Sequence, residues 1–255
     1  MKNIDHLKFG AHQLDGISAL YLDGDFDSVI NLLQGQVTSD CSKLEDGRGQ
    51  PSALCDEKGY VLCNFDIFLH NKLVFIAIDE ELENIFLNEM KKFSPFYKVV
   101  IKSYNICFTG WIRSPDETKL PNEQLIIATD NAHVSLLPHS ENIEIEKNMS
   151  DVDRNSWSLS RKVLKDHIIQ SKDSGKFRPH ELMQHSSRVS FSKGCFRGQE
   201  IIARMEYLGK QKNQTALVVH DSLVEVEKFN IVGQTISKNK KYFSSCMGKK
   251  ELFGS

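Results

Sequence analysis

The sequence predicts an α+β protein, and three stretches of the chain indicate this class. Residues 52–101 contain short apolar strands and one amphipathic helix, the pattern of a small sheet with a helix on one face. Residues 103–146 and 211–255 contain short strands separated by polar turns. A chain of 255 residues, 40% hydrophobic and 26% charged, can bury a sizeable core and form two or three small domains.

The N-terminal region predicts a strand, a helix and an extended segment. Residues 17–24 alternate and end in an Asp-Gly turn, so we expect a strand there. Asp27 or Ser28 can cap a helix over the apolar residues that follow, and Gly35 is expected to end it. The extended segment after it is polar. The side chains that this region offers to a ligand are Gln34, Gln36, Thr38 and Asp40.

The middle of the chain predicts a compact sheet unit followed by further strands. Asp79 is expected to cap the amphipathic helix, and Pro95 to end it. Strands are expected at residues 52–56, 60–69, 73–78, 97–101, 106–112, 125–128 and 134–137. Ser156 is a candidate cap for a helix over 157–167, which places Trp157 and Arg161 on one face. Strands are expected again at residues 215–220, 224–226, 231–236 and 242–243.

Residues 189–200 form the stretch with the clearest chemistry. We expect a strand that ends near Ser192, a glycine turn that carries Cys195, and a helix that begins at Gln199. Lys193 and Arg197 lie two residues to either side of the cysteine. Two cations and a helix N-terminus favour a thiolate or a bound anion. The alternative is a small cysteine buried for packing.

Two motifs resemble one known family. Lys-Gly-Cys-Phe-Arg-Gly-Gln-Glu at 193–200 resembles the signature of the YgfZ-type folate-binding proteins, relatives of the glycine-cleavage T-protein (GcvT). Leu-Gln-Gly-Gln-Val-Thr-Ser-Asp at 33–40 is similar to their N-terminal motif. The resemblance implies a GcvT-like folate-binding fold of two mixed sheet/helix domains with a short C-terminal β-barrel. The expected domains are 1–46 plus 103–210, then 47–102, then the barrel at 211–255.

The resemblance also implies a function. It suggests a tetrahydrofolate-binding accessory protein that supports the assembly or repair of iron–sulfur enzymes, including tRNA-modifying ones, without independent turnover. The expected ligand is tetrahydrofolate or a one-carbon derivative, and the expected partners are iron–sulfur enzymes or cluster assembly proteins. Cys195 is the candidate reactive thiol. The candidate cofactor-binding residues are Gln34, Gln36, Thr38, Asp40, Arg161, Lys193, Arg197, Gln199 and Glu200, and no metal ligands are expected.

Other interpretations stay open at this point. A GcvT-type aminomethyltransferase that uses tetrahydrofolate is the main alternative, although residues 15–40 lack the Asp-Leu-Ser-His-like stretch of those enzymes. A cysteine hydrolase would pair Cys195 with His180 or His185. Instead of binding a ligand, Glu200 can stabilise the helix dipole or form an ion pair with Arg204.

The charge and the cysteines of the sequence limit the expected binding partners and the expected cellular compartment. The net charge of −2 gives no global attraction to nucleic acid, so direct nucleic-acid binding is not expected, and the C-terminal lysines are interpreted as solvated. The six cysteines form no Cys-x-x-Cys pair, which fits a reducing cytosol. The polar N-terminus resembles no signal peptide, and no apolar stretch is long enough to cross a membrane. We therefore expect a cytoplasmic protein.

Overall fold

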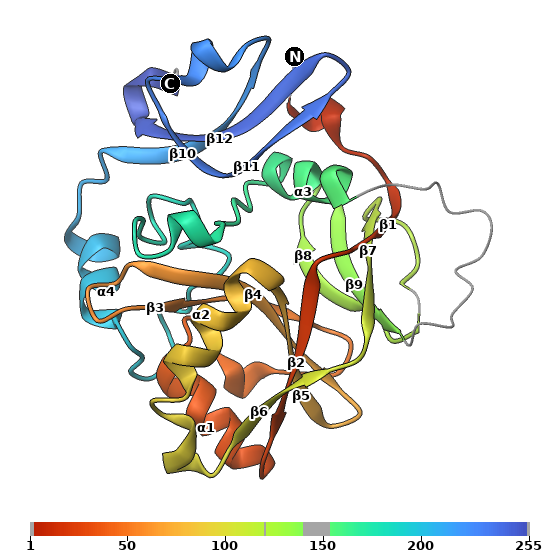
Figure 1. Cartoon of the computed structure of the whole chain (residues 1–255), viewed down its shortest axis with the longest axis vertical. Helices are drawn as coiled ribbons and strands as arrows, with labels where there is room; N and C mark the ends of the chain where they lie inside the picture. Colours follow the sequence, from red (N-terminus) through yellow and green to blue (C-terminus); the bar gives the residue numbers. More distant parts are fainter. Residues whose placement is uncertain (1–2, 120, 140–153, 254–255) are drawn as a thin grey trace.

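A five-stranded antiparallel sheet forms the centre of the computed structural model, which describes residues 3–119, 121–139 and 154–253. Its strand order is β3-β4-β5-β2-β6 (Figure 1). The strands are β2 (Ile17–Asp23), β3 (Gln50–Cys55), β4 (Val61–His70), β5 (Leu73–Asp79) and β6 (Val100–Tyr104). The sequence prediction of these strands is confirmed, although β6 begins later than expected, at Val100.

Two helices cover one face of this sheet, α1 (Phe26–Gln36) and α2 (Glu80–Met90). Leu32, Leu33 and Phe86 of these helices lie in one buried cluster with the apolar residues of the sheet. Asp79 caps α2 as predicted, because its carboxylate accepts a hydrogen bond from Glu81 N at 3.1 Å.

The expected ends of α1 were wrong. Asp25 is the N-cap, and its carboxylate accepts from Ser28 N, so Asp27 and Ser28 lie inside the helix. The helix also continues past Gly35 to Gln36. A glycine can lie inside a helix when packing on either side holds the backbone, and here the neighbouring Leu33 and Val37 are fully buried.

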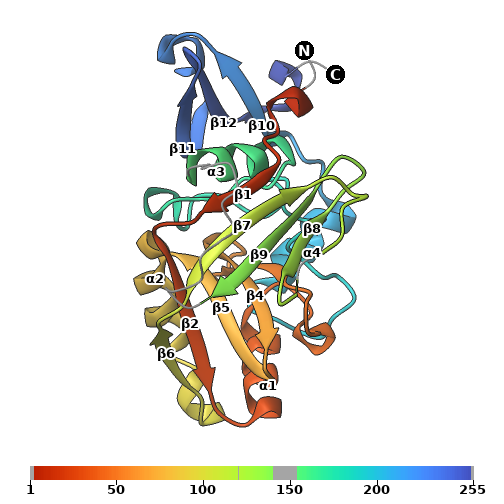
Figure 2. The same ribbon diagram turned by 90° about the vertical axis from the view of Figure 1, so that its right-hand side faces the viewer.

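A four-stranded antiparallel sheet packs on the other face of the five-stranded sheet (Figure 2). Its order is β1-β7-β9-β8, and the strands are β1 (Gly10–Gln13), β7 (Cys107–Arg113), β8 (Gln124–Ala128) and β9 (His133–His139). Phe68 and Phe75 of the five-stranded sheet meet Phe108 and Val134 of the four-stranded sheet in a second buried cluster. The predicted strands in this region are confirmed.

Helix α3 (Arg154–Val163) lies between the four-stranded sheet and the C-terminal part of the chain. Trp157 packs directly on Gly110, where any Cβ would collide with the indole ring. Leu159 is buried against Ile236 and Phe243 of the C-terminal sheet. The described helix includes Arg154 and ends at Val163, so Ser156 lies inside it, and the prediction of a cap at Ser156 and of a helix to residue 167 was wrong.

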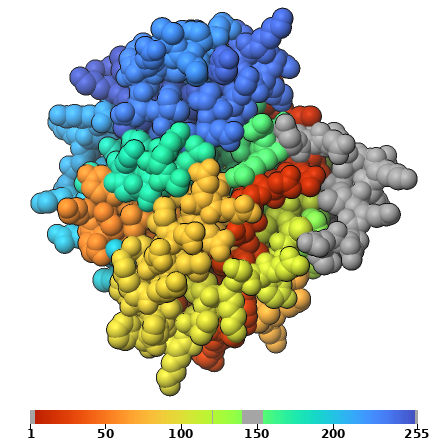
Figure 3. Space-filling model, viewed as in Figure 1, coloured from red at the N-terminus to blue at the C-terminus, as the bar shows by residue number. Residues whose placement is uncertain are grey.

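The C-terminal part follows helix α4 (Gln199–Leu208) and is a small, barrel-like antiparallel sheet of order β10-β12-β11. Its strands are β10 (Asn213–His220), β11 (Asn230–Lys238) and β12 (Lys241–Lys249), and they cover one end of the molecule (Figure 3). The strand expected at 224–226 was wrong, because Leu223–Val226 is a 3-10 helix with a Ser222–Glu225 capping box. The other 3-10 helices are Asn3–His6, Cys41–Lys43, Ser94–Tyr97, Ser171–Asp173 and Lys250–Phe253.

The expected domain boundaries remain a prediction. Strand β2 comes from the expected first domain and pairs with β5 and β6 in the five-stranded sheet. Within the described residues, no helix is long and apolar enough to cross a membrane.

Candidate functional site

The cysteine turn is an irregular loop that ends at α4. Residues 189–198 contain no strand, so the strand expected to end near Ser192 was wrong, whereas α4 begins at Gln199 as predicted. Gly198 caps the helix with φ of +79°, and a Cβ there would collide with Asp56 O. The turn therefore requires glycine at this position, because only glycine combines that backbone angle with so close an approach.

Both cations of the turn are bound by the chain itself. Lys193 is buried, and its Nζ donates to Val37 O at 2.7 Å and to Ser39 O at 2.8 Å. Burial lowers the pKa of Lys193 to about 8. Arg197 forms ion pairs of 2.7 Å with Glu57 and with Glu89. These two side chains therefore fasten the turn to its neighbours.

Cys195 is exposed and has no disulfide partner. By contrast, Cys41, Cys55, Cys63 and Cys246 are buried, and burial raises the pKa of each thiol, for example to about 11 in Cys246. The structure therefore distinguishes the thiol of the turn from the packing cysteines by its contact with solvent.

The polar segment after α1 lies beside the cysteine turn. Arg197 N donates to Gly35 O at 3.1 Å, and Ser190 N donates to Thr38 O at 2.9 Å. The fully buried Thr38 hydroxyl donates to Arg188 O at 2.6 Å and accepts from Ala53 N at 3.0 Å. The two motif regions are thus joined by hydrogen bonds, although they lie far apart in the sequence.

Most of the other predicted site residues of these two regions also bind the chain. Gln34 Nε2 donates to Asp40 Oδ1 at 2.8 Å, and hydrogen bonds from Ser42 and Gln34 hold the pKa of Asp40 well below its usual range. Gln199 Oε1 accepts from Phe196 N at 3.2 Å, and Glu200 is exposed. Gln36 differs from these residues, because its Oε1 is buried and has no hydrogen-bond partner in the described part of the chain.

A cavity lies elsewhere, where the five-stranded sheet, α3, the loop 168–170 and the C-terminal sheet meet. Of the predicted site residues only Arg161 lines it, and no residue of 34–40 or 193–200 does. The apolar residues of the lining are Leu14, Ile17, Phe65, Ala77, Leu136, Trp157, Ile168 and Ile169. The polar residues of the lining are Asn64, Asp66, Asp79, Arg154, Ser158, Arg161, Lys162, Asp166, Gln170, Arg188 and Gln234.

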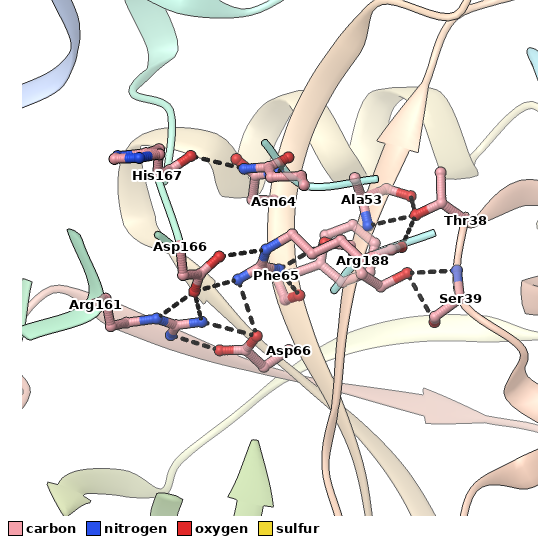
Figure 4. Close-up of polar contacts among 12 residues, drawn as sticks. Thr38, Ser39, Ala53, Asn64, Phe65, Asp66, Arg161, Asp166, His167 and Arg188 are labelled. Carbon is pink, nitrogen blue, oxygen red and sulfur yellow. Dashed lines mark hydrogen bonds and ion pairs between the residues drawn. The ribbon is translucent and has the colours of Figure 1, made fainter. Parts of the chain in front are cut away.

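Two arginines and two aspartates form a buried network in the cavity wall (Figure 4). Arg161 bonds to Asp66 Oδ2 at 2.8 Å and to Asp166 Oδ2 at 2.7 Å, and Arg188 bonds to Asp166 Oδ1 at 2.8 Å. Burial alone would raise the pKa of Asp166, but Arg161 and Arg188 outweigh it and hold that pKa well below its usual range. The network is balanced in charge and forms part of the cavity wall.

Lys162 lies in the same wall outside this network. It is 5% exposed, and its Nζ donates to Ser245 Oγ at 2.8 Å. His167 Nδ1 lies 2.9 Å from the same hydroxyl. Burial lowers the pKa of Lys162 to about 8 and that of His167 to about 3, so the imidazole is neutral at physiological pH.

Reasoning from the sequence missed Asp66, Asp166 and Arg188 of the network and the neighbouring Lys162. A signal was present for one of them, because Asp66 interrupts the apolar run of β4 and a buried charge in a strand is unusual. The other three lie in no motif, and the fold alone brings them together. Within the described residues, no group of three or more side chains of metal-binding type gathers.

The fold defines the class of the protein as GcvT-like α+β. The structure is similar to glycine cleavage system aminomethyltransferase T from Bartonella henselae, with a TM-score of 0.66 and 11% identity over 97% of this chain and 81% of that one. At this identity the likeness concerns the fold.

Sequence comparison shows a similarity to YgfZ proteins. The chain is 27% identical over 209 residues to tRNA-modifying protein YgfZ of Klebsiella pneumoniae and 29% identical over 214 residues to that of Pectobacterium carotovorum. These alignments cover 71% and 72% of this chain, and the chain spans 63% of the length of each relative. No protein-family model matches the chain. The relatives and the structural neighbour together confirm the predicted YgfZ/GcvT-like resemblance.

Proposed function

We propose that the central cavity binds a reduced folate, tetrahydrofolate or a one-carbon derivative, and that the protein acts as an accessory factor for iron–sulfur enzymes. The cavity carries this proposal, because its lining combines apolar residues, Trp157 among them, with amides and charged groups. A reduced folate needs both kinds of contact, since it has a flat ring system with donors and acceptors on its edge, and carboxylates at its other end. The likeness to an aminomethyltransferase fold supports a one-carbon ligand.

The hydrogen-bond donors of the cavity wall also support a folate as the ligand. Lys162 has three N–H donors, and within the described residues one of them is used, by Ser245 Oγ. The side-chain amides of Gln170 and Gln234 lie in the same polar wall. Such groups suit the carboxylates of the ligand, whereas the arginines of the network are already occupied by Asp66 and Asp166.

The accessory role concerns Cys195. The relatives are named tRNA-modifying proteins, and we extend this role to the present chain through iron–sulfur enzymes that modify tRNA. A cluster usually needs four ligands, so a single exposed thiol suits brief contact with a partner or its cluster better than stable cluster binding. We propose that the cavity binds the folate and that the cysteine turn faces the partner, with no independent turnover.

Calorimetric titration with 5-formyltetrahydrofolate tests the cavity as the binding site. Ser158→Phe places a ring into the lining and should abolish binding. Asn155→Phe is the matched control, because Asn155 is an exposed residue of the same helix and is no part of the lining. Cys195→Ala should bind folate like the wild type. Equal binding by Ser158→Phe and Asn155→Phe would exclude the cavity.

Complementation tests the accessory role separately. In a strain that lacks the gene, the activity of a [4Fe–4S] tRNA-modifying enzyme should fall, and the wild-type protein should restore it. Cys195→Ala should restore it less well, whereas Cys107→Ala, at a half-buried cysteine, is the control. Full enzyme activity in the deletion strain contradicts the proposed role.

A further inference from the structure

Lys162 is the one charged side chain of the cavity wall that has no ion-pair partner among the described residues. The other charged side chains of the wall pair with one another, Arg154 with Asp79, and Arg161 and Arg188 with Asp66 and Asp166. These pairs balance exactly as many carboxylates as guanidinium groups. The wall therefore carries one unbalanced positive charge, and it belongs to a residue that is 5% exposed.

None of the described neighbours of Lys162 forms an ion pair with it. The charge of Asp173 raises the pKa of Lys162, but Asp173 Oδ2 accepts hydrogen bonds from Gly233 N at 2.7 Å and from Gln170 N at 3.1 Å and makes no ion pair with Lys162. Cys246 remains a thiol, because burial raises its pKa to about 11. Lys172 adds a second positive charge nearby, and His167 is neutral.

A buried cation without a direct ion-pair partner is costly, and a ligand anion beside it would reduce that cost. We propose that the cavity binds its ligand through an anionic group, a carboxylate or a phosphate, that pairs with the Lys162 ammonium group. This inference rests on the proposed function for the location of the site and adds the charge of the ligand. For a reduced folate, the anion is a carboxylate of the glutamate tail.

The pairing has a consequence that can be measured. Burial holds the pKa of Lys162 at about 8, and an anion beside it would raise that pKa. Ligand binding should therefore take up close to one proton at about pH 9, where the free protein has largely lost it. Calorimetry in two buffers that differ in ionisation enthalpy measures this uptake.

The experiment compares the wild type with Lys162→Met and Lys172→Met. Methionine keeps the length of the side chain without its charge, and Lys172 is an exposed lysine on the adjoining segment. The probes are 5-formyltetrahydrofolate, a tetrahydropterin without the glutamate tail, glutarate and inorganic phosphate. Thermal unfolding of each variant without ligand establishes that it is folded.

We expect 5-formyltetrahydrofolate to bind Lys162→Met about tenfold or more weakly than the wild type, with the proton uptake lost. Lys172→Met should behave like the wild type, and the tetrahydropterin should show no dependence on Lys162. Equal affinity of the folate for wild type and Lys162→Met, without proton uptake, overturns the anion pairing and leaves the folate proposal standing.

A different pattern of binding would support the anion site and contradict the folate proposal. If 5-formyltetrahydrofolate does not bind the wild type while glutarate or phosphate binds in a Lys162-dependent manner, the anion site stands and the folate proposal fails. If no anionic probe binds with any dependence on Lys162, the inference is wrong.

Discussion

Arg188 and Lys162 are two buried cations of the same cavity that differ in how well the chain satisfies them. Arg188 is 1% exposed, and its guanidinium group donates to Asp66, Asp166 and the carbonyls of Ser52 and Phe65. All of its N–H directions are used. Lys162 bonds to one neutral hydroxyl. The first cation therefore belongs to the architecture, and the second is available to a ligand.

The burial of Lys162 should appear in the pH dependence of stability. Its folded-state pKa, about 8, lies below the unfolded value of 10.5, so the unfolded chain binds more protons between these values. The contribution of this group is therefore unfavourable at pH 7 and disappears as the pH rises through this window. Lys162→Met should be more stable than the wild type at pH 7, by up to about 3 kcal/mol, and the difference should vanish near pH 10.5.

Urea unfolding of both proteins at several pH values measures this difference. Lys172→Met is the control, since its side chain is exposed and its removal should leave the stability nearly unchanged at every pH. A Lys162→Met protein that is less stable than the wild type at pH 7 would show that the ammonium group is already satisfied in the folded chain.

At the scale of elements, the Thr38 hydroxyl ties the segment after α1 to β3 and to the loop at residue 188. Thr38→Val keeps the shape of the side chain and removes the hydroxyl, which leaves Ala53 N and Arg188 O without this partner. We expect a loss of about 1–3 kcal/mol in the free energy of unfolding by urea. Thr118→Val, at an exposed threonine, should be nearly neutral. Equal losses of unfolding free energy in both variants would contradict a stabilising role of the Thr38 hydroxyl.

The elements that the sequence predicted well are those with strong local signals. Strand β5 coincides with an apolar run of the sequence, and Asp79 caps the N-terminus of α2. The errors occurred where capping or packing contacts outweigh the preference of the apolar pattern. Val224 and Val226 favour a strand, yet Ser222 and Glu225 close a capping box around a 3-10 turn. The predicted cap Ser156 lies inside helix α3, where its neighbour Trp157 packs on Gly110.

The candidate site was predicted only in part, for a related reason. The cysteine turn and the segment 34–40 have motifs, and the structure places them side by side. The cavity wall is built by Asp66 of β4, Lys162 of α3, and Asp166 and Arg188 of loops. The network depends on ion pairs between residues that lie far apart in the sequence, as between Asp66 and Arg188. No local pattern encodes such a pair.

At the scale of the whole molecule, Gly233 sets how the C-terminal sheet meets the rest. Its φ is +65°, its N–H donates to Asp173, and a Cβ there would collide with Ile168 O. Gly233→Ala should therefore cost about 1–3 kcal/mol and should speed hydrogen exchange in β11 and β12. Gly194→Ala is the control, because nothing lies within 4 Å of a Cβ at that position. If Gly233→Ala left the stability and the hydrogen exchange unchanged, the close approach of Gly233 to Ile168 O would not hold the C-terminal sheet in place.

The strand order of the five-stranded sheet bears on how the chain folds as it leaves the ribosome. Strand β2 is made early but pairs only with β5 and β6, and β1 pairs with the still later β7. The Asp66 carboxylate meets its arginines only when residue 188 has emerged. Nascent chains should therefore stay protease-sensitive and dependent on chaperones until most of the protein has been translated.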